Sequence, residues 1–217
     1  MKPRFIKLFL ALFLPFASFL LLAHFLFYYN NKYENNPVYP MGGVMFCSDA
    51  DLSGDSVIFL AHQWNFFPGK QYTPSDFNEK SVTGGTFLTL GSFGNFSLGS
   101  TSEASNGTAT YRLTLSLPDT ARTYSLYLPE IFSAYTLYLN EEKVCSQGNP
   151  DPAHYQDLIG NKEISFTASG TVHITIIVTN YSHIYSGITY PPAFGTVTAI
   201  QKYLSTRLFI SGITLAA

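Results

Sequence analysis

Apolar side chains recur at every second position along much of this chain. In the segment TATYRLTLSL, Tyr111, Leu113, Leu115 and Leu117 alternate with polar residues. Such alternation is typical of a β-strand that buries one face and exposes the other. The pattern therefore predicts an all-β fold. The other segments that show it are RTYSLYL (122–128), AYTLYL (134–139) and VHITIIVT (172–179), with shorter runs at 56–60, 86–90, 162–167 and 194–200.

Turn-forming residues separate these segments, and about eight short strands divided by such turns are expected to pack as two antiparallel sheets. The composition supports a core of this kind, because 46% of the 217 residues are apolar. Only 12% of the residues are charged and the net charge is −2. This charge balance offers no basic surface to a nucleic acid, so no nucleic-acid partner is expected.

The N-terminus carries a long apolar run. Lys2, Arg4 and Lys7 precede it, and the segment from Leu8 to Tyr29 has no formal charge. A helix of about 20 apolar residues crosses a bilayer, so residues 1–29 are predicted to be a transmembrane signal anchor, followed by a linker over 30–54. The alternative is a cleaved signal peptide. The basic residues before the run place the N-terminus inside and the main domain outside the cell membrane, with a homodimer through the membrane segments as a possible assembly.

The C-terminus turns apolar again. After Lys202 and Arg207 the chain ends with LFISGITLAA. Residues 201–217 are predicted to begin a second transmembrane helix of a longer protein. The alternative is a final strand or a short helix that docks on the domain.

The segment LAHQWNFFPGKQYTPSDF holds the only tryptophan of the chain, Trp64. It could be a platform for a ligand or part of the core. Phe66 lies on the same strand face, which favours the core. The following TPSDFNEK segment is expected to form one helical turn with Ser75 as its cap.

This segment and three later ones, TYRLTLSLP, AYTLYLNEEKVCSQG and NYSHIYSGITYPPAFG, resemble the extracellular domain of bacterial seven-transmembrane receptors with diverse intracellular signalling modules. The likeness covers about residues 55–200. His62 and Phe67 depart from the pattern at its glycine and tyrosine positions, and Glu141 breaks the usual Asn-Gly turn. The matching residues are Leu60, Trp64, Phe66, Pro74, Asp76, Phe77, Tyr111, Arg112, Ala134, Tyr135, Leu137, Asn140, Gly148, Asn180, Gly187 and Gly195.

The resemblance implies a galactose-binding-like jelly-roll sandwich over residues 55–200 that senses an extracytoplasmic ligand as part of a sensor kinase or cyclase. The alternative is a membrane-tethered carbohydrate-binding or adhesion module without signalling output. More distantly, the segments are similar to the sugar-binding domain of glycoside hydrolases of the β-galactosidase type. Glycoside hydrolysis needs two carboxylates about 5 to 10 Å apart on a rigid site, usually on a barrel that this chain has no room to encode, so no catalysis is expected.

Five residues are candidates for binding a small polar ligand such as a carbohydrate. Arg112 lies on the polar face of its strand, where it could receive a carboxylate or hydroxyl groups, or could pair with Glu130. Asn180, His183, Tyr185 and Tyr190 follow a buried strand, and Asn180 could equally cap the turn there.

No cofactor or metal is expected, because the histidines and cysteines show no metal-ligand spacing. A Cys47–Cys145 disulfide is permitted in an exported domain, although Cys47 lies in the predicted linker. The glycine-rich segment GSFGNFSLGS (91–100) is expected to be a loop between strands.

Overall fold

Eleven strands and three helices make up the described part of the chain in a computed structural model, which covers residues 3–30, 33, 36–79, 82, 84–90 and 106–216. The predicted glycine-rich loop at 91–100 lies outside these residues. The helices are α1 (Pro3–Asn30), α2 (Pro74–Glu79) and α3 (Val197–Ala216). The strands are β1 (Val44–Phe46), β2 (Val57–Phe59), β3 (Trp64–Pro68), β4 (Thr86–Leu88), β5 (Gly107–Ser116), β6 (Arg122–Leu128), β7 (Ala134–Leu139), β8 (Glu142–Gln147), β9 (Lys162–Ala168), β10 (Thr171–Asn180) and β11 (Ala193–Thr196).

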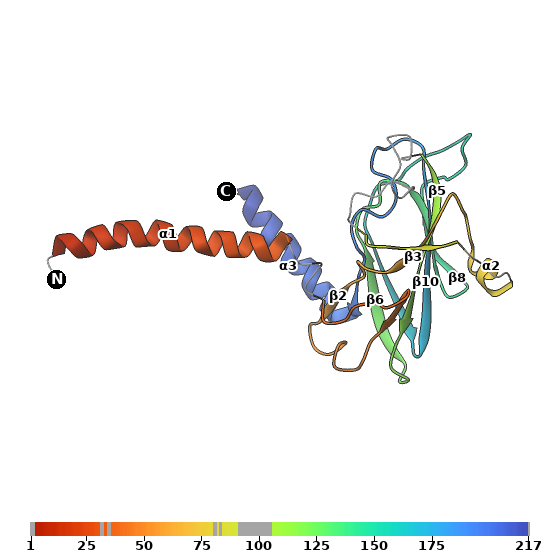
Figure 1. Ribbon diagram of the computed structural model, residues 1–217, viewed down its shortest axis with the longest axis horizontal. Coiled ribbons are helices and arrows are strands. Elements are labelled where there is room, and N and C mark those ends of the chain that lie inside the picture. Colours follow the sequence, from red (N-terminus) through yellow and green to blue (C-terminus); the bar gives the residue numbers. More distant parts are fainter. Residues whose placement is uncertain are drawn as a thin grey trace. The chain divides into compact units, whose positions relative to one another are not determined.

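The strands form two sheets (Figure 1). One sheet has seven strands in the order β4-β3-β5-β10-β7-β8, with β1 paired in parallel to β5; the other has four strands in the order β2-β11-β6-β9. All pairs other than β1–β5 are antiparallel. The predicted all-β, antiparallel sandwich is confirmed.

The alternating residues fill the core as predicted. Leu113 and Leu115 of β5 are completely buried, as are Ile174 and Ile176 of β10. Trp64 is also completely buried, and its indole N–H donates a 2.7 Å hydrogen bond to the Leu60 carbonyl. The core position of Trp64 is therefore confirmed, and its one polar group is satisfied, as a buried tryptophan requires.

The sandwich begins before residue 55. Residues 44–46, which were expected to lie in a linker, form β1 and pair with residues 114–116 of β5. Met45 and Leu52 are buried in the core, with 0% and 2% of their surface exposed. Only three residues pair in β1, so the segment is too short to show a period of two.

Helix α3 begins inside a segment that was expected to be a strand over 194–200. Its first turn is capped by Thr196, whose side-chain oxygen accepts a 3.2 Å hydrogen bond from the Ala199 N–H. Ala199 and Ile200 are buried. The β-branched residues of 196–198 explain the wrong prediction, because the cap at Thr196 overrides their preference for a strand.

The first half of α3 docks on the four-stranded sheet. The Tyr203 ring contacts Phe59 and Tyr127, with ring centroids 5.6 and 6.4 Å apart, and Arg207 donates a 3.2 Å hydrogen bond to the Tyr127 hydroxyl. Lys202 forms an ion pair with Asp55. Beyond these residues, Leu208 and Phe209 are 74% and 70% exposed. The docked helix and the exposed apolar segment are thus successive parts of one helix that starts at Val197, not at residue 201.

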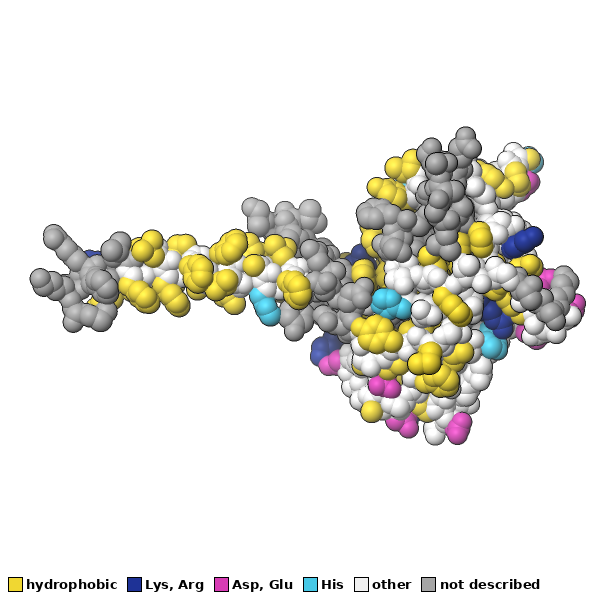
Figure 2. Space-filling view, viewed as in Figure 1, with side chains coloured by type: hydrophobic (Ala, Val, Ile, Leu, Met, Phe, Trp, Pro, Cys, Tyr) yellow, Lys and Arg dark blue, Asp and Glu magenta, His cyan; other side chains and the backbone are white. Residues whose placement is uncertain are grey.

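The N-terminal unit, Met1–Asn36, consists mainly of α1. Hydrophobic side chains lie along its exposed surface (Figure 2). Within the described residues, Phe9–Phe27 is the one helical segment long and apolar enough to cross a membrane, with a mean hydropathy of 2.2. A signal sequence would have the same properties, so both interpretations of residues 1–29 stay open.

Candidate functional site

Helix α2 lies against the outer face of the seven-stranded sheet. Its N-terminus is capped by Thr73, whose backbone N–H donates a 2.8 Å hydrogen bond to the Asp76 carboxylate, so the prediction of Ser75 as the cap was wrong. Phe77 of this helix packs against Phe67 and Tyr72, with centroids 5.5 and 5.8 Å apart. These contacts hold α2 against β3 and the loop that follows it.

Arg112 projects from the polar face of β5 towards this helix. Its guanidinium carbon lies 4.0 Å from the centroid of the Phe77 ring, a cation–π contact. No described carboxylate forms an ion pair with it. The alternative pairing with Glu130 is therefore wrong, because Glu130 follows β6 in the other sheet. The Nη1 atom of Arg112 is buried and makes no hydrogen bond to any residue that the structure describes.

His173 lies beside Arg112 on β10. The register pairs it with Thr114, whose hydroxyl is 3.0 Å from the His173 Nδ1 atom. Burial, and secondarily the charge of Arg112, lowers the pKa of His173 below its usual 6.5. The imidazole is therefore neutral at pH 7 and can offer one donor and one acceptor.

The β7–β8 turn forms the opposite side of the site. Asn140 adopts a left-handed backbone conformation, with a φ of 53°, which asparagine tolerates better than most residues. Its side-chain oxygen accepts a 2.8 Å hydrogen bond from the His173 backbone N–H, which ties the turn to β10. Glu141 has no positive φ, so the turn is not the type I′ of an Asn-Gly pair. The different turn type expected from Glu141 is confirmed.

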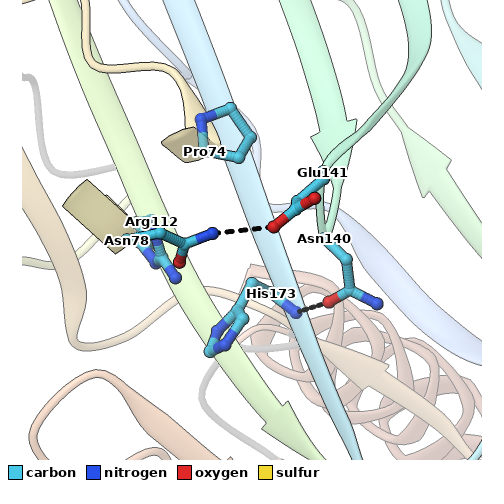
Figure 3. Close-up of a pocket in the computed structure, with 6 residues that line it drawn as sticks. All are labelled: Pro74, Asn78, Arg112, Asn140, Glu141 and His173. Carbon is cyan, nitrogen blue, oxygen red and sulfur yellow. Dashed lines mark hydrogen bonds between the residues drawn. The ribbon is translucent and has the colours of Figure 1, made fainter. Parts of the chain in front are cut away.

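These elements surround a cavity of about 280 Å³, which we call the Arg112 cavity. Figure 3 shows the Asn78 amide and the Glu141 carboxylate pointing towards each other, with a 2.7 Å hydrogen bond from the amide to the carboxylate. The lining therefore combines a guanidinium, a carboxylate, two amides, an imidazole and an apolar ring. The lining residues are Pro74, Asn78, Arg112, Asn140, Glu141 and His173.

A second buried group without a partner lies next to Arg112. Thr175 of β10 pairs directly with Arg112 in the sheet, so the two side chains point to the same face. Thr175 is fully buried, and its hydroxyl makes no hydrogen bond to a described residue. Buried polar groups are almost always hydrogen-bonded. Two unsatisfied groups at adjacent positions therefore mark this part of the face as unusual.

The structure separates the other four predicted site residues from Arg112. They lie at the end of β10 and in the loop of residues 181–192, which we call the aromatic loop. Asn180 pairs with Gly107 of β5, five residues from Arg112, or about 17 Å along a strand. None of these four residues lines the Arg112 cavity.

Asn180 caps the start of the aromatic loop. Its amide donates a 2.6 Å hydrogen bond to the His183 carbonyl and accepts one of 3.1 Å from the His183 N–H. Asn180 itself has no exposed surface. Of the two roles considered for this residue, the structure shows the cap.

The remaining candidates group around Phe132. The His183 ring stacks on Phe132, with centroids 5.0 Å apart and planes 13° apart, and Tyr185 and Tyr190 tilt against the same ring at 6.1 and 6.5 Å. The Tyr185 backbone N–H donates to His183 Nδ1 at 3.0 Å, so Nδ1 is the acceptor nitrogen of this imidazole. The group is an aromatic cluster, half exposed at Tyr185 and Tyr190.

Sequence reasoning identified Arg112 but not the other lining residues as a site. His173 lies on the polar side of an alternating strand, which was a usable signal. Asn78 and Glu141 are 63 residues apart, and nothing in the local sequence predicts that they meet.

The two cysteines are both free, with Cys47 buried in the core and Cys145 half-buried in β8.

No family model and no curated protein matches this chain. Solved structures share part of the fold. A β-glucuronidase from Faecalibacterium prausnitzii matches at a TM-score of 0.49 and 14% identity, over 64% of this chain and 31% of that one. A β-glucuronidase from an uncultured Clostridium matches at a TM-score of 0.47 and 17% identity, over 64% and 28% of the two chains.

A GH2 β-galacturonidase from Eisenbergiella tayi bound to galacturonate matches at a TM-score of 0.45 and 12% identity, over 65% of this chain and 24% of that one. The present chain thus covers less than a third of each of these enzymes. These proteins are glycosidases, the broad group to which the sequence was distantly similar. The likeness is one of partial fold and transfers no ligand or activity. The resemblance to seven-transmembrane receptors stays a prediction.

Proposed function

We propose that the chain is the ligand-binding part of a membrane-anchored receptor, and that its sandwich lies outside the cell membrane and binds a small polyhydroxyl ligand of the carbohydrate class in the Arg112 cavity. The observation that carries the proposal is the buried Nη1 atom of Arg112, which has no partner among the described residues. A guanidinium N–H removed from water needs an acceptor. An oxygen of a ligand in the cavity would supply it.

The lining fits a sugar better than an apolar molecule. A sugar hydroxyl both donates and accepts hydrogen bonds, and the cavity offers the Arg112 and Asn78 donors together with the Glu141 and Asn140 oxygens. Pro74 presents an apolar surface to the face of a sugar ring. The volume of about 280 Å³ is close to the lower limit of about 300 Å³ for ligand pockets, which suits a single sugar unit.

The proposal assigns binding without catalysis to this chain. Of the six lining residues only Glu141 carries a carboxylate, whereas glycoside hydrolysis ordinarily uses a pair. The attachment of α3 supports a receptor role. Because Tyr203 and Arg207 fix the helix to the four-stranded sheet, a ligand that favours one conformer of the sandwich would also shift the conformers of α3.

The test is isothermal titration of the full chain in detergent micelles against neutral monosaccharides, disaccharides and uronic acids. We expect at least one sugar to bind with a Kd below about 1 mM, or roughly −4 kcal/mol. Asn78→Ala should weaken that binding, because it removes a donor from the cavity. If no sugar bound the wild-type chain at that level, the carbohydrate proposal would be wrong.

A tethered carbohydrate-binding or adhesion module without signalling output is the second candidate. Exposed aromatic residues on one sheet face favour it, because such faces can hold a polymer. Phe46 and Phe87 are 66% and 53% exposed, and Phe87 lies in the same cross-strand row as Arg112, two strands away. Reading the gene beyond Ala217 separates the candidates, since only the receptor requires a signalling module in the same protein.

A further inference from the structure

We infer that the ligand of the Arg112 cavity carries a carboxylate, which binds the guanidinium of Arg112, so that the preferred class is the acidic sugars. The inference rests on the proposed function, since it names the ligand class of the same cavity. It concerns the charge of the ligand and therefore makes a separate prediction. Neutral sugars of the same size and shape should bind more weakly.

Arg112 carries a charge that no described carboxylate compensates by an ion pair. A guanidinium stays protonated at all ordinary pH values and matches the planar geometry of a carboxylate. No described carboxylate is within ion-pair distance of it, and its buried Nη1 atom makes no hydrogen bond to a described residue. A partly buried charge without a counter-ion favours an anionic ligand over a neutral one.

Arg112 is also held in place for this contact. Its guanidinium carbon lies 4.0 Å from the Phe77 ring centroid, and Phe77 is itself fixed between Phe67 and Tyr72. Stacking on an aromatic face leaves the N–H edge of a guanidinium free to donate. The side chain therefore loses little freedom when a carboxylate binds, which favours affinity.

Glu141 is the one carboxylate among the six lining residues. It is exposed and accepts the 2.7 Å hydrogen bond from Asn78 (Figure 3), and it forms no ion pair with Arg112. It can accept hydrogen bonds from the hydroxyl groups of a ligand. Its negative charge opposes a dianion such as phosphate more than a monoanion. The cavity thus suits a molecule with one carboxylate and several hydroxyl groups.

The experiment compares sugar pairs that differ only in this group. D-Glucuronate is D-glucose with a carboxylate in place of the terminal CH₂OH, and D-galacturonate relates to D-galactose in the same way. Each is titrated into the full chain in detergent micelles at low ionic strength, with inorganic phosphate as a further anion. Because hydrogen bonds to charged groups are about twice as strong as neutral ones, we expect at least one uronate to bind about tenfold or more tightly than its neutral partner.

Three variants test the role of Arg112. R112Q should abolish the preference for the uronate, and R112K should keep part of it, because lysine retains the charge but not the bidentate geometry. R122Q is the matched control: Arg122 pairs with Asp49 at 2.7 Å on the surface, so its loss should leave the preference unchanged. The fluorescence of the buried Trp64 shows whether each variant is folded, and R112K serves if R112Q is not.

The outcomes separate this inference from the proposed function. Equal affinities for the uronate and its neutral partner, both weakened by R112Q, would overturn the carboxylate inference and leave carbohydrate binding standing. A uronate preference that persists in R112Q, or phosphate that binds more tightly than the uronates, would also overturn it. If no sugar of either kind bound, both the inference and the proposed function would be wrong.

Discussion

The cap of the aromatic loop gives a prediction whose size follows from the geometry. N180A removes the side chain that holds His183 by hydrogen bonds of 2.6 and 3.1 Å. The same side-chain oxygen also accepts a longer hydrogen bond of 3.5 Å from the Tyr155 hydroxyl, which adds little to the two shorter ones. Asn180 has no exposed surface and His183 is only partly exposed, so water can replace these bonds only incompletely. Each such hydrogen bond contributes about 1 to 1.5 kcal/mol. The free energy of unfolding should therefore fall by about 2 to 3 kcal/mol relative to wild type, taking the two bonds together.

The assay is urea unfolding of the full chain in detergent micelles, followed by tryptophan fluorescence. Trp64 is the only tryptophan and is completely buried, so its emission reports unfolding of the sandwich core. With a slope of about 2 kcal/mol per molar urea, the midpoint of N180A should lie about 1 to 1.5 M below wild type. S182A is the matched control, because Ser182 lies in the same loop and its hydrogen bond to Asp157 is exposed. The loss of that bond should cost less than about 0.5 kcal/mol.

N180D tests the role of the amide donor. The carboxylate that it introduces can still accept from the His183 N–H but cannot donate to the His183 carbonyl. Burial beside that carbonyl raises the pKa of the new carboxyl group in the folded state. The group therefore stabilises the fold below its unfolded pKa, near 4, and this stability is lost as the pH rises through the higher folded pKa. N180D should thus be more stable at pH 4.5 than at pH 7, relative to wild type.

A midpoint for N180A within about 0.2 M of wild type, which corresponds to roughly 0.4 kcal/mol, would refute the reasoning. It would mean that other groups form hydrogen bonds with the N–H and carbonyl groups of His183 when the Asn180 amide is absent. An N180D variant whose stability relative to wild type does not change with pH would refute the assignment of the amide as the donor.

Three further predictions concern the sheet and its surface. A Cβ atom on Gly43 would lie 2.2 Å from the Asn65 amide nitrogen, and the φ of Gly43 is +79°, so G43A should lower the free energy of unfolding by about 1 to 3 kcal/mol. In thermal unfolding, the double variant G43A/N65A should regain only part of the lost stability, because the strain of the positive φ remains. Full recovery of wild-type stability would contradict that strain. Burial raises the pKa of the Cys47 thiol to about 12, so a thiol reagent should modify Cys145 first in the folded chain, and equal rates would contradict this. Burial and a neighbouring guanidinium lower the pKa of His173 in the folded state. As the pH falls, the unfolded state therefore takes up the proton first, and the free energy of unfolding should decrease below about pH 6.5. Identical pH profiles of urea unfolding for wild type and H173Q would show that His173 does not cause this loss of stability.

The core was predictable because its signal is local. In β5 and β10 each ten-residue strand shows the alternation several times, so chance agreement is small. In β6 the alternation predicted only Tyr124, Leu126 and Leu128 as buried. Ser125 and Tyr127 are buried as well, because β6 lies between β11 and β9 and α3 covers its other face at Tyr127. That second layer could not be predicted, since the helix was expected to begin further along the chain.

The short elements were missed for a related reason. Strand β1 has three residues and gains its place from a parallel register with β5, about 70 positions along the chain, and local propensity contains no information on such a pairing. The switch from β11 to α3 depends on a single cap at Thr196. A cap residue is common in strands too, so the pattern of 194–200 fitted either structure.

The predicted site residues divide into two groups because strand register, not residue type, decides which side chains meet. Arg112 and Asn180 lie on paired strands, yet their register partners are Thr175 and Gly107, and the resulting separation of about 17 Å along the strands is too long for one sugar unit to bridge. Polar residue types alone cannot reveal that distance. The same register brings His173 beside Arg112 and places the β7–β8 turn next to both through Asn140. A ligand bound at Arg112 would therefore depend on that turn and on α2, and the aromatic loop would affect it only through the stability of the sandwich.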